Sequence, residues 1–129
     1  MSDPFTQIRL TDVKDSAADF GHGEAMEVRF AQEDVGAEET GLSHHRVKPN
    51  MRQPFGHNHD EAEEVYVVIR GSGRMKLDDE VIAVEELDAI RVAPQVTRCF
   101  EAGEDGLEYL VFGVHHKGDG EIVPGWWSD

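Results

Sequence analysis

The sequence predicts an all-β fold, an antiparallel barrel or sandwich, and three features support this prediction. From Met26 to Phe30, apolar and charged side chains alternate with the period of two that a half-buried strand requires. Further segments rich in Val, Ile, Phe and Tyr follow, separated by clusters of Gly, Pro, Asn and Asp. A long helical pattern is missing, and only residues 12–19 suggest a helix, which would be short. This succession of short strands and turns is typical of an all-β domain.

The expected strands and turns follow one another along most of the chain. The strands cover residues 26–30, 41–48, 64–70, 74–77, 80–84, 89–92, 97–101 and 107–114. Turns are expected at Lys48-Pro49-Asn50, Gly71-Ser72-Gly73, Asp78-Asp79 and 102–106, because these residues tolerate or stabilise turn backbones. His115 and His116 follow the last strand and are expected in an exposed loop.

Length and composition favour one globular domain over residues 1–129. The chain has 129 residues with 39% hydrophobic content, which is enough for a single core. Thirteen glycines and five prolines divide it into short segments, but no stretch has the composition of an interdomain linker. We therefore expect a single domain.

The charge of the chain argues against several classes of partner. Twelve Lys and Arg residues face 27 Asp and Glu residues, which gives a formal net charge of −15. Such a surface repels nucleic-acid phosphates and anionic lipids, so we expect neither a nucleic-acid nor a membrane partner. Cys99 is the single cysteine, and the first ten residues lack the pattern of a secretion signal. These features predict a cytoplasmic protein.

Two histidines and a glutamate in the middle of the chain have the spacing of a metal site. In a strand-like segment His57 and His59 share a face, and a hairpin that folds back would bring Glu64 to them. Two histidines and one carboxylate on one side of a metal ion leave open positions on the other side. This arrangement suits Fe(II), Mn(II), Ni(II) or Zn(II).

The same residues resemble the first motif of the cupin superfamily, in its small single-domain form. That motif runs Gly, five residues, His-x-His, three or four residues, Glu, six residues, Gly. Here His57, His59, Glu64 and Gly71 match it, while Met51 occupies the opening glycine position. The resemblance implies a double-stranded β-helix, or jelly-roll barrel, with a core over about residues 43–114. It also implies a divalent metal ion (Fe, Mn, Ni or Zn) inside the barrel and a homodimer.

The second cupin motif is present only in part, in the segment 87–100. Its pattern is Gly, five residues, Pro-x-Gly, two residues, His. If Asp88 and Phe100 set the register, Arg98 occupies the position of the fourth ligand histidine. If Pro94 sets it, Cys99 takes that position. We favour Arg98, because strand alternation places Arg98 with Phe100 on one face and Cys99 on the other.

Two functional hypotheses follow from the three ligands and Arg98. In the first, His57, His59 and Glu64 bind a metal ion, and the protein is an enzyme of the oxygenase, isomerase or decarboxylase type. Its substrate would be a small anionic molecule held by Arg98, since arginine binds carboxylates well. In the second, the module binds a small ligand without metal, and Arg98 pairs with Glu64.

Three further residues are candidates for contacts with the substrate. Arg46 lies on the segment that leads into the first motif, where alternate residues of a barrel strand would face the cavity; His44 and Arg52 lie there too. Gln53 and Tyr66 could add polar contacts to a ligand. The sequence alone does not identify a catalytic residue or a reaction.

Overall fold

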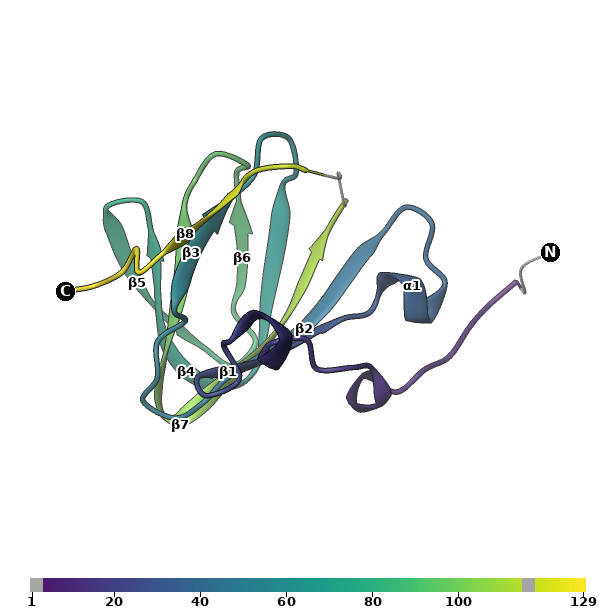
Figure 1. Cartoon of the computed structure of the whole chain (residues 1–129), viewed down its shortest axis with the longest axis horizontal. Helices are drawn as coiled ribbons and strands as arrows, with labels where there is room; N and C mark the ends of the chain where they lie inside the picture. Colours follow the sequence, from purple (N-terminus) through teal and green to yellow (C-terminus); the bar gives the residue numbers. More distant parts are fainter. Residues whose placement is uncertain (1–3, 115–117) are drawn as a thin grey trace.

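The computed structural model describes residues 4–114 and 118–129 of the chain. It contains two short 3-10 turns, one four-residue helix and eight strands (Figure 1). In chain order these are η1 Leu10–Asp12, η2 Ala18–Phe20, β1 Met26–Phe30, α1 Gln32–Val35, β2 Gly41–Val47, β3 Phe55–Asn58, β4 Glu64–Leu77, β5 Glu80–Glu85, β6 Ala89–Val92, β7 Arg98–Gly113 and β8 Glu121–Pro124. The predicted all-β fold is confirmed. No helix in the described ranges is long and apolar enough to cross a membrane.

The two longest strands, β4 and β7, connect both halves of a curled antiparallel sheet (Figure 1). They pair with each other from Glu64↔Gly113 to Leu77↔Arg98. The first half of β4 pairs with β6 and its second half with β5, whereas β7 pairs with β2 at one end and β3 at the other. β1 and β8 extend the two halves as β1-β2 and β3-β8. The result is the jelly-roll barrel expected from the resemblance.

Two predicted turns are wrong, because the chain passes through them without reversing. Gly71-Ser72-Gly73 lies inside β4, and residues 102–106 lie inside β7. The register between these strands shifts between Gly71 and Gly73, so the extra residues form an irregularity in the ladder rather than a hairpin. The glycine-containing segments that predicted turns therefore lie at a bend that the two long strands share.

The other departures from the predicted elements are short segments. Residues 12–19 contain only the ends of two 3-10 turns, and the helix α1 was not predicted. β8 was not predicted either, although β3 matches the strand-like approach expected for His57. The predicted turns at Lys48-Pro49-Asn50 and Asp78-Asp79 are confirmed, and Asn50 and Asp78 have positive φ angles of 61° and 51°. His115 and His116 lie outside the described residues.

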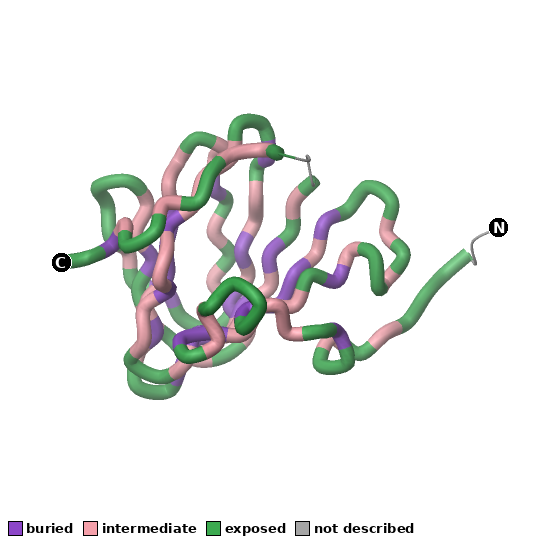
Figure 2. The backbone as a smooth tube through the Cα atoms, in the orientation of Figure 1, coloured by how far each residue is buried: buried purple, intermediate pink, exposed green. Residues whose placement is uncertain are grey.

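The hydrophobic core lies between the two halves of the sheet. Its buried members come mainly from β4 and β7: Tyr66, Val68, Met75, Phe100, Ala102, Leu107, Tyr109 and Val111, with Val47, Val84 and Val92. In Figure 2 buried and partly buried residues alternate along the strands, whereas the N-terminal segment is largely exposed. On the outward face Val65, Val67 and Ile69 stay half-buried in the single chain. The core therefore closes one end of the barrel, and some of its members also line the site described next.

Candidate metal centre

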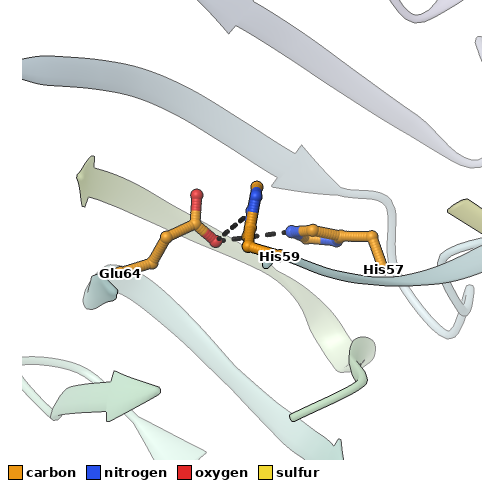
Figure 3. Close-up of side chains that lie close together, drawn as sticks. All are labelled: His57, His59 and Glu64. Atoms are coloured by element: carbon orange, nitrogen blue, oxygen red, sulfur yellow. Dashed lines mark hydrogen bonds and ion pairs between the residues drawn. The ribbon is translucent and has the colours of Figure 1, made fainter. Parts of the chain in front are cut away.

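His57, His59 and Glu64 converge at the side of the barrel where β3 meets the start of β4. His57 lies in β3, His59 follows the end of that strand, and Glu64 is the first residue of β4. Glu64 Oε1 lies 3.4 Å from His57 Nε2 and 3.3 Å from His59 Nε2. Figure 3 shows both imidazoles turned toward this one oxygen. One potential ligand atom from each residue lies within 4.8 Å of the other two, close enough to bind one metal ion.

Backbone hydrogen bonds shape the turn that carries these ligands. The carboxylate of Asp119 accepts backbone N–H groups from Asp60, Glu61 and Ala62, which lie between His59 and Glu64. Asp119 Oδ2 also lies 3.4 Å from His59 Nδ1. Asp119 therefore fixes both the loop and the orientation of one imidazole. No local pattern in the sequence identified it, because it lies far along the chain and reaches the site only through the β3–β8 pairing.

The electrostatics of the cluster keep Glu64 ionised. Burial raises the pKa of Glu64, but its interactions with His57, His59 and the Tyr66 hydroxyl outweigh this and hold the pKa well below its usual range. Burial lowers the pKa of His57, against the pull of Glu64, while the interaction with Glu64 raises the pKa of His59. A carboxylate and a neutral imidazole are the forms that a metal ion needs, so a bound ion would compete with a proton for His59.

Tyr66 holds the carboxylate of Glu64 in place. It is buried, and its hydroxyl donates to Glu64 Oε1 at 2.6 Å and lies 3.4 Å from His57 Nε2. Burial and the adjacent carboxylate raise the pKa of Tyr66 well above its ordinary value, so the hydroxyl stays protonated and keeps donating. The structure therefore brings this predicted site residue into contact with the cluster.

We expect Tyr66→Phe to lower the affinity for Zn²⁺ by roughly 10- to 100-fold, because groups that orient a metal ligand contribute about this much. Tyr109→Phe is the matched control. It also loses a buried hydroxyl, which accepts a hydrogen bond from Gln53 Nε2 at 2.9 Å, but in the described part of the chain this hydroxyl makes no hydrogen bond to the three ligands. Zn²⁺ titration of both variants tests the prediction, and equal losses would show that Tyr66 acts only through the core.

Arg98 does not form the expected pair with Glu64. Its side chain is buried, and its guanidinium donates to the backbone carbonyls of His57, Pro94 and Ala93 at 3.3 to 3.5 Å. Among the described residues it makes no ion pair within 4.0 Å. This corrects the metal-free hypothesis, in which the Arg98 charge neutralised Glu64. The Cys99 thiol donates toward the Gln53 backbone carbonyl, burial raises its pKa to about 12, and it does not belong to the cluster of potential ligands.

Arg46 lies on the other side of the sheet from the metal cluster. Its guanidinium pairs with Glu27 and Glu108, and His44 also bonds to Glu108 at 2.6 Å. The prediction therefore placed the wrong set of alternating β2 side chains inside the barrel. Arg46 points outward and is not placed to hold a ligand in the barrel. Ser43 and His45, which sequence reasoning missed, face inward in its place.

His45 is an uncharged group in the wall of the barrel. Its ring stacks on Tyr109 with 5.0 Å between the ring centroids, and its Nε2 lies 2.8 Å from the Ser43 hydroxyl. Burial lowers the pKa of His45 to about 3, so the ring is neutral at any ordinary pH. Val28 pairs with His45, so the His45 side chain lies on the same face of the sheet as the apolar residues of β1. This pairing was the signal that could have revealed that His45 points into the barrel.

The three potential ligands lie in the wall of a large open cavity. The cavity has a volume of about 1030 Å³ and is bounded by β1, β2, β3, β8 and the inward residues of β4 and β7. Gln53, a predicted site residue, also lines it, but both ends of its amide are engaged. Its Nε2 donates to the Tyr109 hydroxyl, and its Oε1 accepts the backbone N–H of Phe100. Gln53 therefore holds the cavity floor together and has little capacity left for a ligand.

Comparisons with known proteins place this architecture among the cupins. No protein-family model and no curated protein sequence matches the chain. Among solved structures, a cupin protein from Bacteroides fragilis superposes with a TM-score of 0.70 at 19% identity, covering 91% of this chain and 89% of that one. The polyketide cyclase RemF from Streptomyces resistomycificus gives 0.74 at 22% identity, covering 100% and 89%. A sugar phosphate isomerase of the cupin superfamily from Silicibacter pomeroyi gives 0.70 at 13% identity, covering 92% of both chains.

The chain therefore has the cupin fold that its first motif predicted. At these identities the similarity extends to the fold alone. The neighbours named as enzymes include a cyclase and an isomerase, so the same barrel supports different reactions. The function of this chain has to be argued from its own site.

Proposed function

We propose that the protein binds a divalent metal ion through His57, His59 and Glu64 and is a metal-dependent enzyme that acts on a molecule held in the barrel cavity. The observation that carries this proposal is the convergence of three ligand atoms within 4.8 Å of one another in the wall of a cavity of about 1030 Å³. A purely structural role for these residues would not require them to border an open cavity. Sites of this form are common places for small-molecule chemistry.

The side chains fit a metal ion in their chemistry as well as in their positions. Both ring nitrogens of His59 are buried and make no well-formed hydrogen bond, although carboxylate oxygens of Glu64 and Asp119 lie 3.3 and 3.4 Å from them. A buried polar atom without a hydrogen bond is costly, and a metal ion bound at Nε2 would supply the missing partner there. Two imidazoles and one carboxylate are the ligands of Fe(II), Mn(II), Ni(II) and Zn(II) sites, and the set leaves coordination positions open toward the cavity.

The residues around the ligands have distinct parts in this proposal. A bound ion would act as a Lewis acid toward an oxygen of the substrate. Glu64 and His57 are already in the forms that bind a metal, and Tyr66 orients the Glu64 carboxylate. Arg98 acts indirectly, because its hydrogen bond to the His57 backbone carbonyl helps to position β3. The reaction belongs to the oxygenase, isomerase or decarboxylase type, and the fold does not choose among these.

Elemental analysis of the protein purified without an affinity tag tests the proposal. We expect about one Fe, Mn, Ni or Zn per chain, taken up either during expression or on anaerobic addition of the ions. Because the ligands come together only in the folded state, metal at about 100 times its dissociation constant should add roughly 2.7 kcal/mol to the free energy of unfolding. The failure of all four ions to bind, with no shift in the melting temperature, would refute the proposal.

A further inference from the structure

The cavity beside the proposed metal site has an aromatic and aliphatic lining. Tyr66, Phe100 and Tyr109 form its floor, with 4.2 Å between the ring centroids of Phe100 and Tyr109 and 5.4 Å between those of Tyr66 and Phe100. Val28 and Phe55 continue this surface on β1 and β3. The polar groups on the floor are engaged with one another, since Tyr66 donates to Glu64 and Tyr109 bonds to Gln53. The three aromatic rings of the floor are only 1 to 2% exposed, and His45 and Phe100 already stack on Tyr109, so the floor closes the inner end of the cavity with apolar groups.

Apolar side chains also surround the opening of the cavity. Phe20, Phe30, Val114 and Ile122 line it, although they are 65%, 56%, 53% and 63% exposed. They come from four separate segments of the chain: η2, β1, the residue after β7, and β8. Exposed apolar side chains that gather around one opening are a mark of a site for an apolar ligand.

The charges around the cavity disfavour an anionic ligand at the opening. Its described lining residues include five carboxylates, on Glu33, Asp34, Glu64, Asp119 and Glu121, and no Lys or Arg. With a net charge of −15 on the whole chain, an entering anion would be repelled. A cationic ligand would not be repelled at the opening, but a bound divalent ion would repel it at the inner end. An uncharged molecule meets neither obstacle.

We infer that the substrate is an uncharged, largely apolar molecule, which packs against the apolar side chains around the opening and presents an oxygen toward His57, His59 and Glu64. This inference rests on the proposed metal-dependent function and names its substrate class. It departs from the small anionic ligand expected from the sequence, because that expectation depended on Arg98 and Arg46. Arg98 is bonded to backbone carbonyls, and Arg46 lies on the outer face.

Fluorescence titration with N-phenyl-1-naphthylamine, a neutral two-ring-system probe, tests the inference on the full chain with and without Zn²⁺. We expect saturable binding, displacement by 2-naphthol, and no displacement by oxalate or glucose 6-phosphate at the same concentrations. Phe30→Asp and Ile122→Asp should each weaken the probe about tenfold, because they replace apolar surface at the opening with charge. Phe5→Asp is the matched control, since Phe5 is 80% exposed and does not line the cavity.

The outcomes separate this inference from the proposed function. Zinc uptake together with displacement by oxalate or glucose 6-phosphate but not by 2-naphthol would overturn the substrate class and leave the metal site standing. Probe binding that all three Asp variants reduce equally, or none reduces, would also overturn it, because the probe would then be bound elsewhere. Binding at the opening without any metal uptake would support an apolar-ligand cavity while refuting the enzyme. Circular dichroism of each variant confirms that the barrel is folded.

Discussion

Replacing Glu64 by Gln is expected to lower the affinity for Zn²⁺ by at least about 100-fold, a larger loss than orienting residues produce when they are changed. The carboxylate supplies the single negative charge of the proposed ligand set, and its Oε1 lies within 3.4 Å of both His57 Nε2 and His59 Nε2. An amide has the same shape but is a much weaker ligand for a divalent ion. Its oxygen can still accept the Tyr66 hydroxyl, so the variant should fold. Competition for Zn²⁺ with a chromophoric chelator measures the loss.

Glu63→Gln is the control for this change. Glu63 is the neighbouring residue in the chain, its side chain is 56% exposed, and it pairs with Arg91 at the surface. The variant removes the same formal charge from nearly the same place, so any general electrostatic effect on Zn²⁺ should be common to both. A similar small loss in the two variants would mean that Glu64 is not a ligand, and the metal site would have to be abandoned.

The sequence predicted the three potential ligands because they lie close together in the chain. His57 lies in β3, His59 just beyond it and Glu64 at the start of β4, so the spacing of the three residues and a chain that folds back between the strands are enough to predict that they meet. The parts of the site that were missed come from elsewhere. Asp119 reaches His59 only because β8 pairs with β3, and such a long-range pairing leaves no local pattern.

The direction of β2 shows a different reason for error. Strand alternation allows two assignments of faces, and His44 and Arg46 were considered inward because alternate residues of this segment would face the cavity of a cupin-like barrel. In the structure they meet Glu108 on the outer face, and His45 faces inward. The choice depended on the register with β1, where Val28 opposes His45. Polar character alone cannot decide a face when both faces of a strand carry polar residues.

The long strands β4 and β7 limited the prediction of the fold in a similar way. Glycine at residues 71, 73 and 106 was interpreted as a sign of turns, but at 71 and 73 it allows the close approach of the two strands, and at 106 it allows a positive φ of 82°. A Cβ at Gly71 would collide with the backbone carbonyl of Gly106. The same residue type suits a turn and a bend within a ladder, so composition did not separate the two. The all-β class was nevertheless predicted, because alternation along each half of these strands is unaffected by the bend.

The second large effect is expected from Gly120→Ala, which should lower the free energy of unfolding by about 3 kcal/mol or more and weaken Zn²⁺ binding. Gly120 precedes β8 and has a φ of 83°, a conformation that costs other residues about 1 to 2 kcal/mol. A Cβ there would also collide with the backbone carbonyl of Asn58 and lie 2.6 Å from the Cα of His59. Relief of that collision requires β8 to move from β3, which carries Asp119 away from His59.

Gly125→Ala separates the cost of the left-handed backbone from the cost of the collision with β3. Gly125 lies just beyond the other end of β8. It has a φ of 65°, and a Cβ there would have no described atom within 4 Å. This variant should show only the cost of the left-handed backbone and retain the Zn²⁺ affinity of the unaltered chain. Urea unfolding and Zn²⁺ titration of both variants measure the difference. If Gly120→Ala were no worse than Gly125→Ala in both measurements, the close contact between β3 and β8 would not position His59, and the role assigned to Asp119 would be wrong.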